Sequence, residues 1–167
     1  NEPRPPENLD YSNAIWHYAR ATAFVKTGDV DSAVAEREKL LPLRDAANIS
    51  FLDTLYYPAS MLLEIADSLL QGEIAIAMGE ADAGIAHFEN AVAVQDKLPY
   101  TEPPFWYYPT RHTLGKALLA IGNAAEAEVV YRRDLEIYPR NGWAMFGLIQ
   151  SLEAQDKDAT DIRTKFD

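Results

Sequence analysis

The stretch that decides the fold is LGKALLAIGNAAEAEVVYRRDLEIYP, which runs from Leu114 to Pro139. On both sides of Gly122 the apolar residues recur every three or four positions, which is the spacing of one face of a helix. Gly122 suits the left-handed residue that ends a helix, and Pro139 would stop the helix that follows. We therefore predict two amphipathic helices joined by one tight turn.

The two predicted helices also carry the residues that close packing needs. Gly115 and Ala127 are small enough to let two helix backbones approach each other. Leu118 and Tyr131 are large side chains that would fill the seam between the helices. These four residues predict that the two helices pack together as a hairpin.

The same positions resemble the consensus of the tetratricopeptide repeat, a helical hairpin with a period of about 34 residues. The matching residues are Leu114, Gly115, Leu118, Gly122, Ala127, Tyr131 and Pro139. The resemblance implies an all-α fold in which antiparallel hairpins stack as an irregular α-solenoid of about seven to eight helices. It also implies an interaction scaffold and not an enzyme.

Three further hairpins appear when the rest of the chain is aligned with this one. Gly28 and Gly79 take the place of the turn glycine in two of them, and Trp143 and Gly147 match the first helix of the repeat in the last. We expect an extended arm at 1–8 and a single helical domain at 9–167. Its hairpins would span about 9–41, 58–97, 108–138 and 141–166, with connectors at 42–57, where Pro42 closes a helix, and at 98–107.

Two segments carry a closer resemblance. Glu102–Arg111 reads EPPFWYYPTR and Asn141–Leu148 reads NGWAMFGL. Both are similar to the EPPxWYYPxR and NGWxxFGL elements in the C-terminal part of a group of bacterial tetratricopeptide repeat proteins without an assigned activity. The resemblance implies a bacterial origin and further N-terminal repeats, and it transfers no catalytic residue. The start at Asn1, without a methionine, likewise leads us to expect a fragment of a longer protein.

Composition narrows the classes of partner and chemistry. The net charge of −11 argues against a nucleic acid as the main partner. The chain has no cysteine, and its three histidines, His17, His87 and His112, fall in different hairpins, so we expect no metal site and no cofactor. No apolar run reaches the roughly 20 residues of a membrane span, so no membrane insertion is expected. The compartment is left open, with the cytoplasm favoured.

The second predicted helix of the stretch from Leu114 to Pro139 carries several carboxylates, and their pattern does not indicate a catalytic pair. We interpret Glu126, Glu128, Asp134 and Glu136 as the solvated face of an amphipathic helix. The chain also has no nucleophile elbow and no phosphate-binding glycine loop. We therefore expect a protein that is not an enzyme.

Candidate binding residues come first from the groove that first helices line in tetratricopeptide proteins. By this resemblance the groove would include Tyr18, Thr22, Glu73, His112 and Lys116. The lysine and asparagine arrangement that holds a C-terminal carboxylate in some families is missing, so we do not expect such a clamp.

A second candidate is the aromatic and basic segment from Phe105 to His112, whose polar tips belong to Tyr107, Tyr108, Arg111 and His112. Similar clusters stand at 16–18 and at 56–58. Such residues are typical of binding hot spots. They are equally suited to covering the end of a hydrophobic core between repeats.

Three functions remain open from the sequence. The first is a scaffold that binds a protein or peptide partner in the groove. The alternative is a small-ligand or catalytic pocket formed by the cluster at 105–112. The third is a structural role in which the fragment extends a longer array or associates with itself, because terminal repeats leave apolar faces uncovered.

Overall fold

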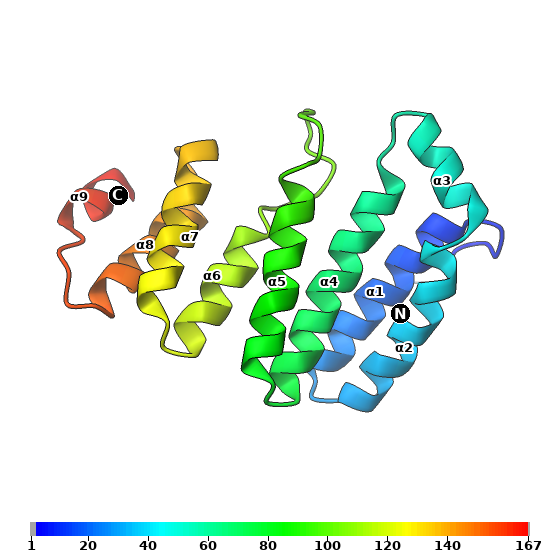
Figure 1. The fold of residues 1–167 in the computed structure, drawn as a ribbon, viewed down its shortest axis with the longest axis horizontal. Coiled ribbons are helices and arrows are strands. Elements are labelled where there is room, and N and C mark those ends of the chain that lie inside the picture. Colours follow the sequence, from blue (N-terminus) through cyan, green and yellow to red (C-terminus); the bar gives the residue numbers. More distant parts are fainter. Residues whose placement is uncertain (1–2, 167) are drawn as a thin grey trace. The chain divides into compact units, whose positions relative to one another are not determined.

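The computed structural model describes residues 3–166, except for the side chain of Ala47, and the regular structure in this part of the chain consists of helices without a strand (Figure 1). The predicted all-α class is confirmed. The described residues form nine helices, so the expected number of seven to eight was wrong. The helices are α1 (Asp10–Lys26), α2 (Val30–Arg44), α3 (Ala47–Thr54), α4 (Ala59–Ala77), α5 (Ala81–Gln95), α6 (Arg111–Ala120), α7 (Ala124–Ile137), α8 (Gly142–Glu153) and α9 (Thr160–Phe166).

The additional helix is α3, which lies inside the expected connector at 42–57. Its sequence has no clear helical period, and it is held by packing against α4 and α1, with Ile49 buried. The helix before it, α2, continues through Pro42 to Arg44, so Pro42 does not close it as expected. Arg44 binds Asp67 on α4, and this tertiary contact holds the last turn of α2 in place despite the proline.

The chain divides after Tyr107 into two compact units, where the sequence led us to expect one domain at 9–167. The boundary lies in a segment with prolines at 99, 103, 104 and 109. Proline lacks the backbone donor of a helix, so neither α5 nor α6 can extend through this segment. We therefore describe each unit by itself.

Four helix pairs are joined by the same turn. The turn residues are Gly28, Gly79, Gly122 and Asp156, and all four have a positive φ. Each donates its N–H to the carbonyl three residues earlier, and the next residue donates to the carbonyl five residues before it. These are the two bonds of a Schellman motif, which ends a helix in a left-handed residue.

The fourth turn shows that our alignment of the last hairpin with the other repeats was shifted by two residues. Gly115 precedes its turn glycine by seven residues, whereas Gly147 precedes Asp156 by nine. Trp143, which we matched to the consensus tryptophan, is 77% exposed. The hairpin was expected at about 141–166, and its turn has Asp156 at the position where the other three turns have glycine.

Close backbone approaches occur at glycines facing aromatic rings. A Cβ atom on Gly72 of α4 would lie 2.4 Å from the ring of Phe88 on α5. In the second unit a Cβ on Gly115 would lie 2.5 Å from the ring of Tyr131. The predicted packing of Tyr131 against Gly115 is therefore confirmed, and the same ring also packs against Gly147 of α8.

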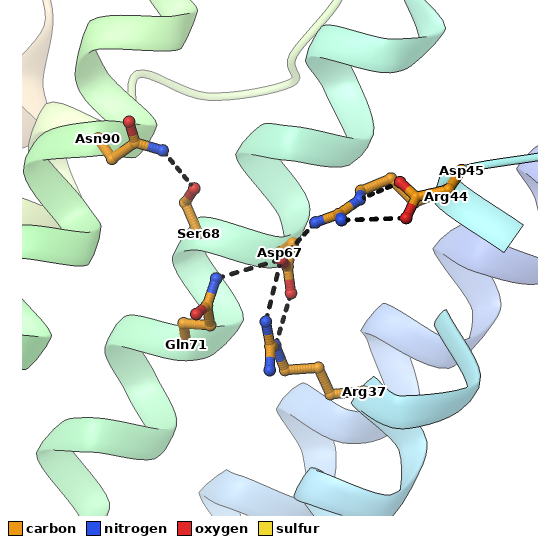
Figure 2. Close-up of polar contacts among 7 residues, drawn as sticks. All are labelled: Arg37, Arg44, Asp45, Asp67, Ser68, Gln71 and Asn90. Carbon is orange, nitrogen blue, oxygen red and sulfur yellow. Dashed lines mark hydrogen bonds and ion pairs between the residues drawn. The ribbon is translucent and has the colours of Figure 1, made fainter. Parts of the chain in front are cut away.

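In the first unit α4 is the central helix, because it contacts α1, α2, α3 and α5. A buried carboxylate, Asp67, ties it to α2 (Figure 2). Arg37 binds Asp67 through two nitrogens at 2.6 and 3.1 Å, and Arg44 adds a third bond at 2.8 Å. Gln71 donates to the same carboxylate at 3.1 Å. With four donors the charge of Asp67 is fully compensated, so the group has a structural role.

A second polar contact joins α1 to α2. Glu36 of α2 is buried and lies 2.7 Å from Nδ1 of His17, and it also binds Arg20 and Lys39. Burial opposes ionisation of this carboxyl, but the hydrogen bonds from His17, Lys39 and Arg20 outweigh it and lower its pKa to about 2. The α1–α2 hairpin is therefore fixed by an ionised glutamate.

Candidate binding face

The predicted groove residues of the first unit lie on two helices that pack against each other, α1 and α4. Tyr18, Thr22 and Lys26 follow each other at intervals of four residues along α1, so they share one side of that helix. Lys26 reaches across to Glu73 on α4, with Nζ 2.7 Å from Oε1. We call the surface formed by Tyr18, Thr22, Lys26 and Glu73 the α1–α4 face.

One end of the α1–α4 face is covered by an aromatic residue from the connector after α5. The ring of Trp106 lies 5.9 Å from that of Tyr18 in an edge-to-face arrangement, and both residues are buried. Tyr18 therefore forms part of the packed end of the face, while Thr22 and Glu73 are half-buried farther along it.

Two oxygens of the α1–α4 face are buried and have no hydrogen-bond partner among the described residues. They are Oγ1 of Thr22 and Oε2 of Glu73. Leaving such a group unpaired typically costs about 1–3 kcal/mol, which is why most buried polar atoms in proteins are paired. The face therefore contains one hydroxyl and one carboxylate oxygen whose hydrogen-bonding capacity is unused within the part of the chain that the structure describes.

The aromatic and basic cluster at 105–112 is divided between the two units. Tyr107 belongs to the first unit and is mostly exposed, whereas Tyr108, Arg111 and His112 belong to the second. Within the second unit the Tyr108 hydroxyl lies 3.2 Å from that of Thr113, and Arg111 is buried.

Lys116 is exposed on α6, one turn after His112. The four predicted polar tips, which belong to Tyr107, Tyr108, Arg111 and His112, thus have different surroundings.

His112 takes part in a polar cluster that the sequence did not predict. Its Nε2 lies 2.9 Å from Nδ2 of Asn141 and 3.2 Å from Oδ2 of Asp134. Asn141 accepts the N–H groups of Trp143 and Ala144 as the cap of α8, which turns its NH2 group toward the other two side chains. This orientation lets Nδ2 of Asn141 donate to Oδ2 of Asp134 and brings it beside the His112 ring.

Asp134 was expected on the solvated face of its helix, and this was wrong because the residue is completely buried. It receives a hydrogen bond from Asn141 at 3.2 Å, and its Oδ1 has no hydrogen-bond partner in the described part of the chain. Its position could have been read from spacing, since Asp134 follows Tyr131 by three residues and Ala127 by seven. Those three residues share the buried stripe of α7.

A separate cleft of about 450 Å³ opens in the first unit where α3 ends, α4 begins and the connector after α5 passes. We call it the aromatic cleft. Beside it, Tyr57 makes edge-to-face contacts with Phe105 at 5.7 Å and with Tyr11 at 5.4 Å. The residues that line the cleft are Asp53, Tyr56, Pro58, Met61, Pro99, Thr101 and Phe105.

The described residues contain no group of three or more histidine, aspartate or glutamate side chains placed to hold a metal ion. Among the same residues, no helix has the length and apolar character needed to cross a bilayer.

The fold defines an all-helical protein of paired helices. Comparisons with family models, with curated proteins and with solved structures gave no match to this chain.

Proposed function

We propose that the chain is a non-catalytic binding scaffold of the tetratricopeptide type, which holds a peptide or protein segment on the α1–α4 face. The observation that carries this proposal is the pair of buried oxygens without a partner, on Thr22 and Glu73. They lie on the first helices of two successive hairpins, where the resemblance to tetratricopeptide repeats expects a ligand.

The repeated turns and the packing of successive helices support the scaffold class. The four Schellman turns give four hairpins of one design. In the first unit α4 packs on both helices of the preceding hairpin, and in the second unit α8 packs on both α6 and α7. Contacts of each hairpin with the next helix are what an array of stacked hairpins requires.

A peptide backbone supplies the groups that the two unused oxygens need. The hydroxyl of Thr22 can donate to a carbonyl, and Oε2 of Glu73 can accept from an amide or from a basic side chain. Lys26 already neutralises the other oxygen of Glu73, so the site does not demand a strongly charged ligand. An extended segment with alternating N–H and C=O groups fits this pair.

Peptide phage display on the purified chain tests the proposal. A selected peptide should bind three- to tenfold more weakly to Thr22→Val and about tenfold or more weakly to Glu73→Gln, because a hydrogen bond is worth about 0.5–1.5 kcal/mol and more when charged. Thr27→Val is the matched control, since the Thr27 hydroxyl bonds to backbone carbonyls of α1. Enrichment of no peptide, or binding to both site variants as tight as to the original chain, would contradict the proposal.

Self-association is a second candidate role, favoured by exposed aromatic residues in the second unit. Trp143 is largely exposed on α8, and Phe146 and Phe166 are exposed with ring centroids 6.4 Å apart. Exposed aromatic groups of this kind often mark protein interfaces. Light scattering over a range of concentrations tests this role. A strict monomer at all of them would count against it.

A further inference from the structure

The aromatic cleft is separate from the α1–α4 face and has features that the scaffold proposal does not use. Its walls are mostly apolar and come from three segments of the first unit. Its volume of about 450 Å³ lies within the range of about 300–1,000 Å³ that is typical of ligand pockets. The cleft is therefore large enough to receive a side chain of a partner.

Tyr56, on the wall of the cleft, has a backbone conformation that a tyrosine rarely adopts. Its φ is +62°, and it ends α3 with the same two bonds as the hairpin turns, from Tyr56 to Asp53 and from Tyr57 to Leu52. Three of the four hairpin turns have glycine at this position, where a Cβ atom is unfavourable.

The tyrosine at position 56 gains almost nothing from burial, because 93% of it is exposed. It therefore costs folding stability without contributing to the core. Strained residues that persist without a packing role are characteristic of binding sites. Phe51, Leu55 and Tyr100 are exposed as well, so the first unit carries a group of exposed apolar side chains in the segments that form the cleft.

Among the described residues, the only charged side chain that lines the cleft is that of Asp53, and Glu102 directly follows the wall residue Thr101 in the sequence. Within the described residues, the Asp53 carboxylate accepts hydrogen bonds only from the N–H and hydroxyl of Ser60, and the Glu102 carboxylate accepts one from the hydroxyl of Tyr100. Neither carboxylate forms an ion pair within the described residues, in contrast to Asp67 and Glu36. No lysine or arginine lines the cleft. A cationic partner would supply the missing charges.

The cleft also contains a polar group that needs a partner. Oγ1 of Thr101 is buried and has no hydrogen-bond partner within residues 3–166, and Thr101 lies on the cleft wall. A hydroxyl in an otherwise apolar wall can fix the orientation of a bound chain through one backbone amide or carbonyl.

We propose that the aromatic cleft binds a short basic peptide segment. One apolar side chain of the segment enters between Tyr56, Met61 and Phe105, and its backbone bonds to Thr101. Flanking lysine or arginine side chains pair with Asp53 and Glu102. This site works independently of the α1–α4 face.

Three labelled peptides of equal length test the proposal by fluorescence anisotropy. The first has leucine flanked by lysines, the second has leucine flanked by glutamates, and the third has serine flanked by lysines. We expect saturable binding of the first, and at least tenfold weaker binding of the other two. Absence of binding by the first peptide, or equal binding of all three, would overturn the proposal.

Two glycine substitutions at left-handed positions separate binding from folding. Tyr56→Gly relieves the backbone strain, so we expect an unchanged or higher melting temperature together with at least tenfold weaker binding of the first peptide. Asp156→Gly is the matched control, which should also keep or raise the melting temperature but leave binding unchanged. Full binding by Tyr56→Gly, or equal losses in the two variants, would overturn the assignment of the cleft.

Thr22→Val distinguishes this proposal from the scaffold proposal. It should leave binding of the lysine–leucine peptide unchanged, because Thr22 is not part of the cleft wall. A loss of that binding equal to the loss in Tyr56→Gly would overturn the independence of the two sites.

Discussion

Single residues decide how closely the helices pack, and the glycines facing aromatic rings are the clearest case. The ring of Tyr131 occupies the space that a Cβ atom would need on both Gly115 and Gly147. The ring of Phe88 does the same at Gly72. Rings in a packed core move only at a cost in free energy, so one added methyl group should destabilise the fold at each of these positions.

We predict that Gly115→Ala lowers the free energy of unfolding by about 1–3 kcal/mol, the usual cost of overpacking a core. Urea unfolding followed by circular dichroism measures the change. Gly142→Ala is the matched control, because a Cβ there would lie at an ordinary 3.6 Å from Phe166. If Gly115→Ala were as stable as the original chain, the close packing of α6 and α7 would be wrong.

Thr22 offers a test that does not depend on a ligand. Replacing its unpaired buried hydroxyl by the methyl group of Thr22→Val should raise the free energy of unfolding by about 1 kcal/mol, since no hydrogen bond is lost. Ser151→Ala should have the opposite effect, because the Ser151 hydroxyl donates to the carbonyl of Gly147 at 2.7 Å. A loss of stability in Thr22→Val would mean that the hydroxyl is paired.

The pKa of Glu36 predicts how stability depends on pH. The folded state holds this pKa at about 2, below the usual glutamate value of 4.5, so the unfolded chain binds a proton more readily. Its contribution is complete above about pH 4.5 and is lost as the pH falls toward 2. Glu36→Gln should reduce the loss of stability in this window. An identical pH profile in the variant would contradict the role of Glu36.

Single elements are fixed by contacts as well as by their own sequences. The turns at Gly28, Gly79 and Gly122 were predictable, because glycine marks the left-handed end of a helix. The turn at Asp156 and the helix α3 were not, since an aspartate can occupy a glycine position and α3 is held by packing on α4. Asp67 lies between Arg37 and Arg44 because α2 packs against α4. No local sequence pattern specifies that packing.

The ion pairs of Asp67 should contribute more to the free energy of unfolding than the ion pair of Asp45, an exposed carboxylate that also binds Arg44. We predict that Asp67→Ala lowers the free energy of unfolding by about 2–4 kcal/mol, because it leaves Arg37 and Arg44 without their buried partner. Asp45→Ala is the control, since Asp45 binds Arg44 at the surface. Its urea midpoint should stay unchanged. Equal effects of the two variants would contradict the structural role of Asp67.

At the scale of the whole molecule, the described chain is two compact helical units. The sequence predicted the helical class and the first three turns. It also placed Thr22 and Glu73 among the candidate groove residues, and the structure adds their unpaired oxygens, which depend on the packing of α1 against α4. Stacking of the hairpins into a solenoid and binding of a peptide stay predictions.

The most direct test of the scaffold proposal is to map a selected peptide onto the chain by amide chemical-shift changes in NMR spectra. The proposal predicts that the largest changes cluster around Thr22 and Lys26 on α1 and around Glu73 on α4. They should be much smaller for a peptide with the same composition in scrambled order. Changes confined to other helices, or equal changes with the scrambled peptide, would contradict the proposal that the α1–α4 face is the binding surface.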